Sequence, residues 1–171
     1  MELKEALRKR KSVRCYKETQ ISDEALRYIL FAAQAAPISR KAYSDIHITV
    51  VQNAALRKAM EKIYDENGNP FYGAPTLILV SSKELPKKEM PYLNVAGMIE
   101  NMLLACTDLG LGSIYLTSFI EKVFKDEKIK YKLGIKEEYM PIAAVGVGYP
   151  AHKEVIESKE EIEKRITINR V

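Results

Sequence analysis

The sequence lacks the motifs of the common nucleotide-binding folds and contains very little histidine. Gly110-Leu111-Gly112 is followed by Ser113-Ile114-Tyr115, so the GxGxxG fingerprint is not completed, and no phosphate-binding P-loop is present. The two histidines, His47 and His152, stand beside no recognisable nucleophile motif. A Rossmann enzyme, a P-loop enzyme and a histidine-based hydrolase are therefore disfavoured.

Cysteine is scarce as well, with only Cys15 and Cys106, far apart in the chain. There is no CxxC and no metal ligand at usable spacing, so the sequence predicts no metal site. Cys106 lies in an apolar helical pattern, where a buried small hydrophobe is expected. Cys15 is interpreted as an ordinary thiol on a strand.

A signal peptide and a membrane-spanning run are also missing from the pattern. The first eight residues are charged and amphipathic, and no apolar run reaches the ~18 residues that a membrane span requires. We therefore expect a soluble, cytoplasmic protein with no membrane partner.

The composition favours one domain over residues 1–171, with 47% hydrophobic residues for its core. The net charge is only +4, and acidic residues are interspersed through most of the chain. The exception is the stretch from Lys4 to Lys17, which holds seven Lys or Arg residues and one Glu. Because no nucleic-acid-binding signature accompanies it, we expect no nucleic-acid partner and rank a nucleic-acid arm lowest.

This basic stretch is densest at Arg10-Lys11-Ser12-Val13-Arg14, which places three cations and a hydroxyl within five residues. Arg supplies paired N–H donors, Lys a compact charge and Ser a short-range hydrogen bond, the donor set that a phosphate monoester requires. A solvated helix end has the same composition, since cations are favoured near helix C-termini. The downstream sequence decides between these interpretations.

Helical and strand patterns alternate along the chain, which predicts an α/β or α+β sandwich. The helical patterns cover 2–10, 25–33 after an N-cap at Ser22, 54–64 after an N-cap at Asn53, 92–109, 119–132 as one or two short helices, and 154–164. The strand patterns cover 47–51, 76–80, 113–116 and 141–149, and the apolar run 76–80 predicts a strand buried on both faces.

The longest helical pattern, 92–109, is apolar almost all round and ends at the C-cap Gly110. One small sheet does not cover so many apolar faces, so we expect a two-fold partner to bury the rest. The tail 166–171 alternates apolar and polar residues. This alternation predicts a strand that reaches toward the partner.

Five segments, taken in order, resemble the FMN-dependent nitroreductase family. They are the arginine–serine–arginine signature at 10–16, the Ala-Pro loop at 35–41, the Ala-Pro strand at 73–80, the central helix and Gly-Leu-Gly turn at 101–113, and the last core strand at 145–150. The ordered set spans nearly the whole chain and is more specific than any one of its members.

The resemblance implies an α+β nitroreductase-like fold with a central, mostly antiparallel sheet flanked by helices, and a homodimer that binds FMN at the subunit interface. It also implies an oxidoreductase in which NADH or NADPH reduces FMN. The reduced flavin then passes electrons to a nitroaromatic, quinone or related small-molecule acceptor by a ping-pong mechanism. The alternative is a flavin-binding or flavin-storing dimer without turnover.

The resemblance assigns the FMN phosphate to Arg10, Ser12 and Arg14, assisted by Lys11 or by a cation from the tail. The N-terminal arm 1–20 and the tail 152–171 are implied to contribute to this site and to the dimer. The candidates in the tail are Lys164, Arg165 and Arg170.

The rest of the flavin site is implied by two further segments. Ser39, Arg40 and Lys41 are expected along the ribityl chain and the pyrimidine edge. The backbone N–H groups of Thr117 and Ser118 are expected to face flavin N5 and O4, where they stabilise negative charge on the reduced ring. No acid–base side chain is required, because the flavin performs the hydride transfer.

The chain departs from the family pattern in the loop after Ser39. The family loop commonly continues with Asn, Gln and Pro-Trp, whereas Lys41, Tyr43 and Ser44-Asp45 stand here. Lys41 is expected to place a positive charge near the pyrimidine, which favours the reduced, anionic flavin, and Tyr43 is expected to cover the ring. The other interpretation is that the loop has lost its usual role and that the substrate differs.

Overall fold

A four-stranded sheet forms the middle layer of the protein, whose computed structural model describes residues 1–64, 68–152 and 158–170. Its strands are β1 (Ile46–Val51), β2 (Thr76–Ser82), β3 (Gly112–Leu116) and β4 (Met140–Gly148), in the spatial order β1-β2-β4-β3. Every neighbouring pair is antiparallel, as the family resemblance predicted. All seven residues of the central strand β2 are buried, which confirms the expectation for the run 76–80.

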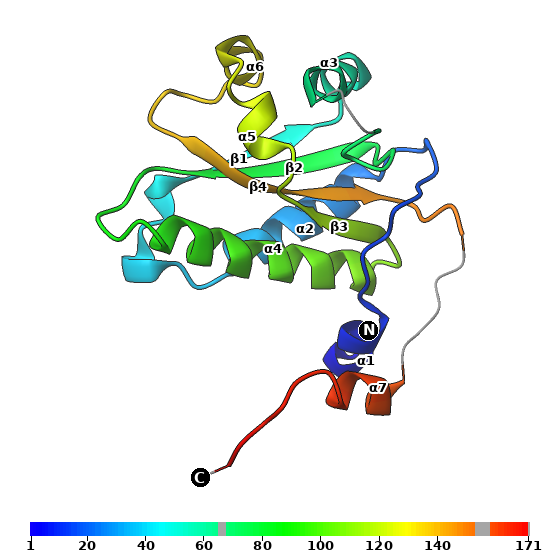
Figure 1. Cartoon of the computed structure of the whole chain (residues 1–171). Coiled ribbons are helices and arrows are strands. Elements are labelled where there is room, and N and C mark those ends of the chain that lie inside the picture. Colours follow the sequence, from blue (N-terminus) through cyan, green and yellow to red (C-terminus); the bar gives the residue numbers. More distant parts are fainter. Residues whose placement is uncertain (65–67, 153–157, 171) are drawn as a thin grey trace.

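Helices cover both faces of this sheet, so the expected α+β sandwich is confirmed (Figure 1). One face carries α2 (Asp23–Gln34) and α4 (Met90–Asp108), and the other carries α3 (Ala54–Tyr64), α5 (Ile120–Val123) and α6 (Glu127–Lys132). Both predicted caps are present, because the side chain of Ser22 accepts from the N–H of Ala25 and that of Asn53 accepts from the N–H of Leu56.

The core is divided by the sheet into two clusters of buried side chains. The first joins α2 and α4 to residues such as Ile78 and Val145, and the second joins the helices of the other face to Leu77 and Phe119. Successive residues of β2 therefore pack into the clusters on opposite faces of the sheet, because side chains alternate along a strand.

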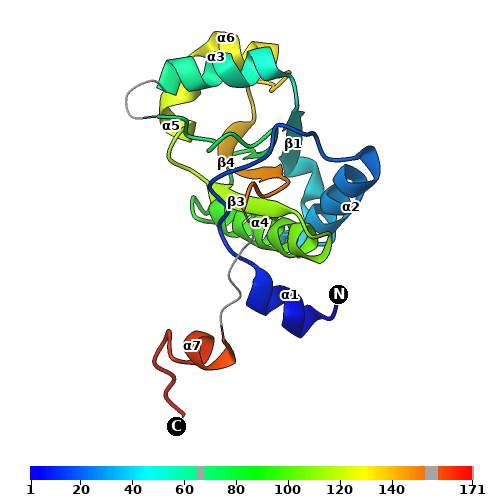
Figure 2. The same ribbon diagram turned by 90° about the vertical axis from the view of Figure 1, so that its right-hand side faces the viewer.

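The two terminal helices, α1 (Leu3–Lys9) and α7 (Lys159–Glu163), lie outside the sandwich, beyond α4 (Figures 1 and 2). The helix predicted over 154–164 is confirmed for the stretch after the capping-box residue Ser158, and residues 154–157 lie outside the described part. None of the described helices is both long and apolar enough to cross a bilayer.

The prediction of a strand in the tail is wrong for this single chain. Residues 165–170 follow α7 away from the sheet and form no strand (Figure 1). The physical reason is that a strand needs the free edge of a neighbouring strand, and the tail meets none in its own chain.

Candidate functional site

The basic segment leaves the end of α1 and lies along the edge of the sheet. Ser12 forms an isolated bridge with Ser113, the second residue of β3, and the N–H of Val13 donates to the carbonyl oxygen of Ser113 over 3.0 Å. Further on, the N–H of Lys17 donates to the carbonyl oxygen of Tyr149 over 2.9 Å. The segment is therefore held beside the start of β3 and the end of β4.

The two glycines of the Gly-Leu-Gly turn make this arrangement possible in different ways. Gly110 has a φ of +70°, the left-handed conformation that ends α4. At Gly112 a Cβ atom would stand 2.9 Å from the Cγ2 atom of Val13 and 3.1 Å from the Cγ atom of Pro150. The second glycine thus permits the close approach of the basic segment to β3.

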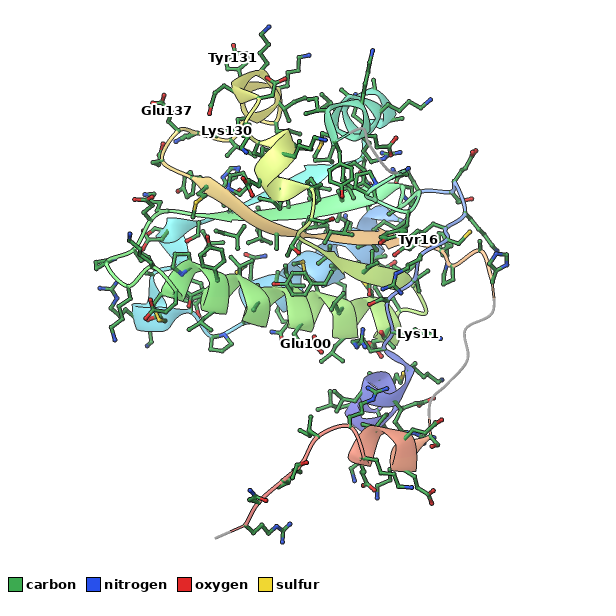
Figure 3. All side chains as sticks on the ribbon, viewed as in Figure 1. Lys11, Tyr16, Glu100, Lys130, Tyr131 and Glu137 are labelled. Atoms are coloured by element: carbon green, nitrogen blue, oxygen red, sulfur yellow. The ribbon has the colours of Figure 1, made fainter. Side chains whose placement is uncertain are left out.

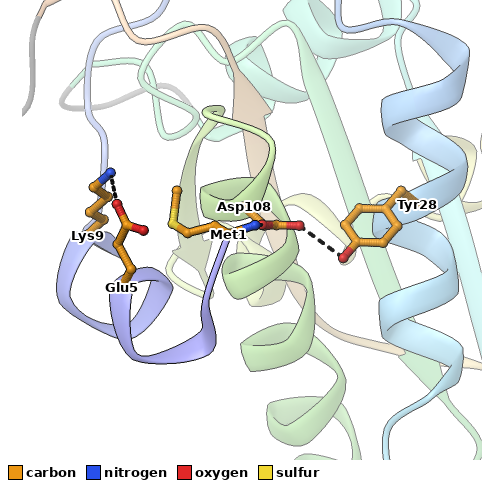
Figure 4. Close-up of polar contacts among 5 residues, drawn as sticks. All are labelled: Met1, Glu5, Lys9, Tyr28 and Asp108. Carbon is orange, nitrogen blue, oxygen red and sulfur yellow. Dashed lines mark hydrogen bonds and ion pairs between the residues drawn. The ribbon is translucent and has the colours of Figure 1, made fainter.

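An open pocket of about 460 Å³ lies beside this segment and is lined by Lys9, Lys11, Lys17 and His152. None of the described residues that line it carries a carboxylate side chain. Lys9 is paired with Glu5 on the surface of α1 (Figure 4). The pocket is consequently positive and suits an anionic group.

Arg10, Ser12 and Arg14 do not line this pocket, although their sequence neighbours Lys11 and Val13 do. No carboxylate in the described part of the chain lies within ion-pair distance of either arginine. Arg10 caps the C-terminus of α1 through its backbone, while Nη1 of Arg14 donates to the carbonyl oxygen of Ser12 over 3.4 Å. The Arg14 guanidinium also lies 5.8 Å from the ring centroid of Tyr72. Most of the guanidinium donors therefore remain available to a ligand.

A second cleft, of about 580 Å³, lies beyond the other end of β3. Three tyrosines line it together with Thr117: Tyr92, Tyr115 and Tyr139. Burial raises the pKa of the Tyr115 phenol, so this hydroxyl stays neutral and able to donate a hydrogen bond. The cleft offers aromatic surface beside the exposed residues Thr117 and Ser118.

The charges of this second cleft balance one another, in contrast to the first pocket. Lys125 and Lys130 are matched by Glu121 and Glu137 among its lining residues. Figure 3 places Lys130 and Glu137 at the opposite end of the molecule from Lys11 of the basic pocket.

Strand β3 connects the two cavities along an edge of the sheet. From Gly112 to Leu116 it spans about 13 Å, at the usual rise of a strand. Thr117 and Ser118 follow directly. This edge fits an elongated ligand that carries an anion at one end and a flat, largely apolar ring at the other.

The predicted residues Ser39, Arg40 and Lys41 form the short 3₁₀ turn η1 (Ser39–Lys41). This turn lies near the start of α4, whereas the basic pocket lies beyond its end. The N–H of Ser39 donates to Oδ1 of Asn94 over 3.1 Å. Arg40 and Lys41 have φ values of 57° and 56°, so two successive non-glycine residues are left-handed. Both side chains are exposed.

Tyr43 opens the next turn, η2 (Tyr43–Asp45), and its hydroxyl donates to the carbonyl oxygen of Ala36 over 3.5 Å. The hydroxyl of Tyr139 donates to the carbonyl oxygen of Ser44 over 3.0 Å, which fixes this turn to the start of β4. The ring of Tyr139 in turn packs on His47, with centroids 5.2 Å apart. His47 thus has a packing role.

The basic segment and the Ser39–Lys41 turn therefore lie at the two ends of α4 (Figure 1). Asn94 marks one end and Asp108 the other, and 14 residues of helix separate them by about 21 Å. One chain alone does not bring the Ser39–Lys41 turn to the basic pocket.

The cations predicted in the tail lie away from the basic pocket in this chain. Lys164, Arg165 and Arg170 are exposed, none of them lines that pocket, and the tail runs outward beyond α1 (Figure 2). The contribution of the tail to the phosphate site thus stays a prediction.

No sequence pattern predicted the contact that fixes α1. The ammonium group of Met1 donates to Asp108 at the end of α4, and the hydroxyl of Tyr28 donates to Oδ2 of Asp108 over 3.1 Å (Figure 4). The hydrogen bond from Met1 and then that from Tyr28 lower the pKa of Asp108. The same contact raises the pKa of the Met1 amine.

Two hydrogen bonds that hold the turns at 39–45 were not predicted from the sequence, the one between Ser39 and Asn94 and the one between Tyr139 and Ser44. The sequence signal that could have revealed the first of them is Asn94 itself, a polar residue in the otherwise apolar buried face of α4.

Cys106 is buried as predicted, and burial raises the pKa of its thiol to about 12, so it is unreactive near neutral pH.

Comparison with known proteins gives one family and several relatives. The family model described as "Putative TM nitroreductase" matches residues 2–170. A protein of Methanothermobacter thermautotrophicus named "Putative NADH dehydrogenase/NAD(P)H nitroreductase" is 31% identical over 157 residues, which are 88% of this chain and 78% of the relative. A protein of Archaeoglobus fulgidus with the same name is 29% identical over 143 residues, 82% of this chain and 81% of the relative.

A solved structure shares the fold over its full length. It is a nitroreductase with bound FMN from Bacteroides fragilis, with a TM-score of 0.84 and 29% sequence identity, covering 99% of this chain and 100% of that one.

Proposed function

The chain belongs to the nitroreductase family, and we propose that it is an FMN-dependent oxidoreductase. NADH or NADPH is the proposed electron donor, and a nitroaromatic, quinone or related small molecule is the acceptor, in a ping-pong cycle. When bound, FMN supplies the hydride-transfer chemistry between these substrates. The observation that carries the proposal is the family match over residues 2–170, supported by relatives named NAD(P)H nitroreductase.

The basic pocket fits the phosphate end of FMN. Arg10, Ser12 and Arg14 belong to the segment that borders this pocket, and neither arginine has a described carboxylate partner. Lys11 lines the pocket itself. These side chains would bind the phosphate through charge-assisted hydrogen bonds, which are about twice as strong as neutral ones.

The cleft beyond β3 fits the ring end. Among the described loops and turns, no hydrogen bond uses the backbone N–H of Thr117 or Ser118, so both donors remain available to a ring edge. Tyr115 and Tyr139 supply aromatic walls. In this position the two N–H groups would stabilise negative charge as it develops on the ring.

A second copy of the chain would complete the site. The Ser39–Lys41 turn lies too far from the basic pocket of its own chain to contact a ligand there. Large apolar side chains also remain exposed on the helices, including Leu3 at 64% and Phe31 at 64%. Ile166 and Ile168 of the tail are each 73% exposed. We propose a homodimer in which the turn faces the partner's flavin and the tail reaches across, bringing a cation toward the phosphate.

The cysteines support a cytoplasmic location for this proposed enzyme. Cys15 is exposed, Cys106 is buried, and both are free thiols. Free thiols are typical of the reducing cytoplasm, where NADH and NADPH are also found.

Steady-state kinetics test the proposal. NADH or NADPH is varied at several fixed concentrations of p-nitrobenzoate or menadione, with the protein fully loaded with FMN. A ping-pong oxidoreductase gives parallel double-reciprocal lines. Full flavin loading with no nicotinamide oxidation for any acceptor would instead support the alternative, a flavin-binding dimer without turnover.

A further inference from the structure

Asn94 occupies an unusual position in α4. It is 5% exposed, and the other buried residues of this helix are apolar: Pro91, Val95, Met98, Ile99, Met102, Leu103, Ala105 and Cys106. A buried amide costs stability unless it is hydrogen-bonded, and asparagine is a weaker helix former than the leucine that would fit this stripe. Asn94 therefore contributes nothing to α4 that an apolar residue would not contribute better.

The known partner of this amide lies in another element. Oδ1 of Asn94 accepts the backbone N–H of Ser39, the first residue of the turn that contains the left-handed Arg40 and Lys41. The left-handed conformation costs about 1–2 kcal/mol for each L-residue with a side chain. Such backbone persists only where its surroundings hold it, and it is concentrated at functional sites.

The turn is held at both ends. Within it, the N–H of Lys41 donates to the carbonyl oxygen of Ile38 over 2.9 Å, and Asn94 fixes its start. The following turn is fixed by Tyr139, which donates to Ser44. These hydrogen bonds hold a turn that exposes two adjacent cations, Arg40 and Lys41, to solvent.

We propose that Asn94 is a positioning residue whose buried amide holds the Ser39–Lys41 turn in the conformation that presents Arg40 and Lys41 to FMN bound by the partner subunit. This inference rests on the proposed function, since it assigns a residue to the same flavin site. Asn94 acts through the backbone of Ser39 and does not itself touch the flavin.

The test compares two asparagines of one helix. Asn94→Leu removes the acceptor of the Ser39 N–H. Asn101→Leu is the matched control, because Nδ2 of Asn101 donates to the carbonyl oxygen of Ala32 over 3.1 Å and thus braces α2 instead of the turn. Both variants lose one partly or fully buried hydrogen bond of α4.

Two readouts are taken on the full-length protein, the dissociation constant of FMN and the hydrogen-exchange rate of peptides covering 38–45. In Asn94→Leu we expect FMN binding to weaken about five- to tenfold, as the loss of one buried hydrogen bond implies, with faster exchange across the turn. Asn101→Leu is expected to change neither. Asn94→Asp keeps an acceptor for Ser39 and is expected to restore slow exchange.

The outcomes separate this inference from the proposed function. A wild-type protein that takes up no FMN contradicts the proposed function and removes the flavin role of Asn94, while the exchange rates still report whether the amide holds the turn. Wild-type FMN binding with unchanged affinity in Asn94→Leu overturns the inference alone. Equal weakening in Asn94→Leu and Asn101→Leu also overturns it, because the effect would then be general destabilisation of α4.

Discussion

The backbone N–H of Val13 donates to the carbonyl oxygen of Ser113 across 3.0 Å, which joins the basic segment to the first residues of β3. The two residues are 100 positions apart in the sequence. Their contact makes the Gly-Leu-Gly turn part of the proposed phosphate site, although the turn carries no charged side chain.

Gly112→Ala tests this junction. The added methyl group would stand 2.9 Å from Val13, so the basic segment must shift, and we expect a loss of about 1–3 kcal/mol in stability together with weaker FMN binding. Thermal unfolding and FMN titration measure the two effects. Gly110→Ala is the control, because its methyl group meets nothing within 4 Å and only its φ of +70° is unfavourable. It is expected to reduce stability with little change in FMN affinity.

Arg14→Gln tests whether Arg14 binds the phosphate of FMN. Loss of a charge-assisted contact is expected to weaken FMN binding by about 1.5–3 kcal/mol, or roughly ten- to a hundredfold. Riboflavin, which lacks the phosphate, should bind the variant and the wild type equally. Lys132→Gln removes one exposed charge of α6 as a control. An equal loss for FMN and riboflavin would place Arg14 elsewhere on the ligand.

Lys41→Asn tests the departure of this chain from the family loop. Removing a cation near the pyrimidine is expected to lower the midpoint potential of the bound flavin, by about 30 mV for each 1.4 kcal/mol of lost stabilisation of the reduced form. Lys41→Arg keeps the charge and should stay close to the wild-type potential. An unchanged potential in Lys41→Asn would show that this loop does not reach the flavin.

The contact between Met1, Tyr28 and Asp108 predicts a pH dependence of stability. The lowered pKa of Asp108 means that its contribution is present above the ordinary value of 3.8 and is lost as the pH falls through the lowered pKa. The raised pKa of the Met1 amine means that its contribution is present below the ordinary value of 8.0 and is lost as the pH rises through the raised pKa.

Asp108→Asn measures that contribution. The difference in Tm between this variant and the wild type should be largest near neutral pH and shrink in both acid and alkali. Tyr131→Phe, at a position 85% exposed, serves as a control with no such profile. A pH-independent difference would contradict the ionic nature of the contact.

Ile166→Asp combined with Ile168→Asp tests the proposed reach of the tail to a partner. Both side chains are 73% exposed in the single chain, so their replacement should leave the stability of an isolated protomer nearly unchanged. If the dimer buries them, we expect the double variant to dissociate at a higher protein concentration than the wild type does, as measured by analytical ultracentrifugation. Tyr131→Asp is the control. Unaltered dimerisation in the double variant would exclude the tail from the interface.

The sequence predicted the fold well where a local pattern decides it. The apolar run 76–80 and the caps at Ser22 and Asn53 each specify one element through nearby residues, and all three were confirmed. The prediction of a strand in the tail is wrong for the single chain, because alternation predicts a strand only where a free edge is available, and that edge depends on the arrangement of whole chains.

The site was less accessible to sequence reasoning. The Arg-Lys-Ser-Val-Arg segment was identified from its residue types and Thr117 from the family resemblance, and the structure places a cavity beside each. The support provided by Asn94 and Tyr139 was missed, because each residue acts through a hydrogen bond to a backbone 50 to 100 positions away. No local pattern contains that information.

The absorbance spectrum of the purified protein, recorded before and after anaerobic addition of NADH or NADPH, tests the central claim most directly. An FMN-dependent oxidoreductase is expected to show flavin absorption bands that bleach when the reductant is added. A colourless protein that takes up no added FMN would contradict the cofactor assignment and the function built on it.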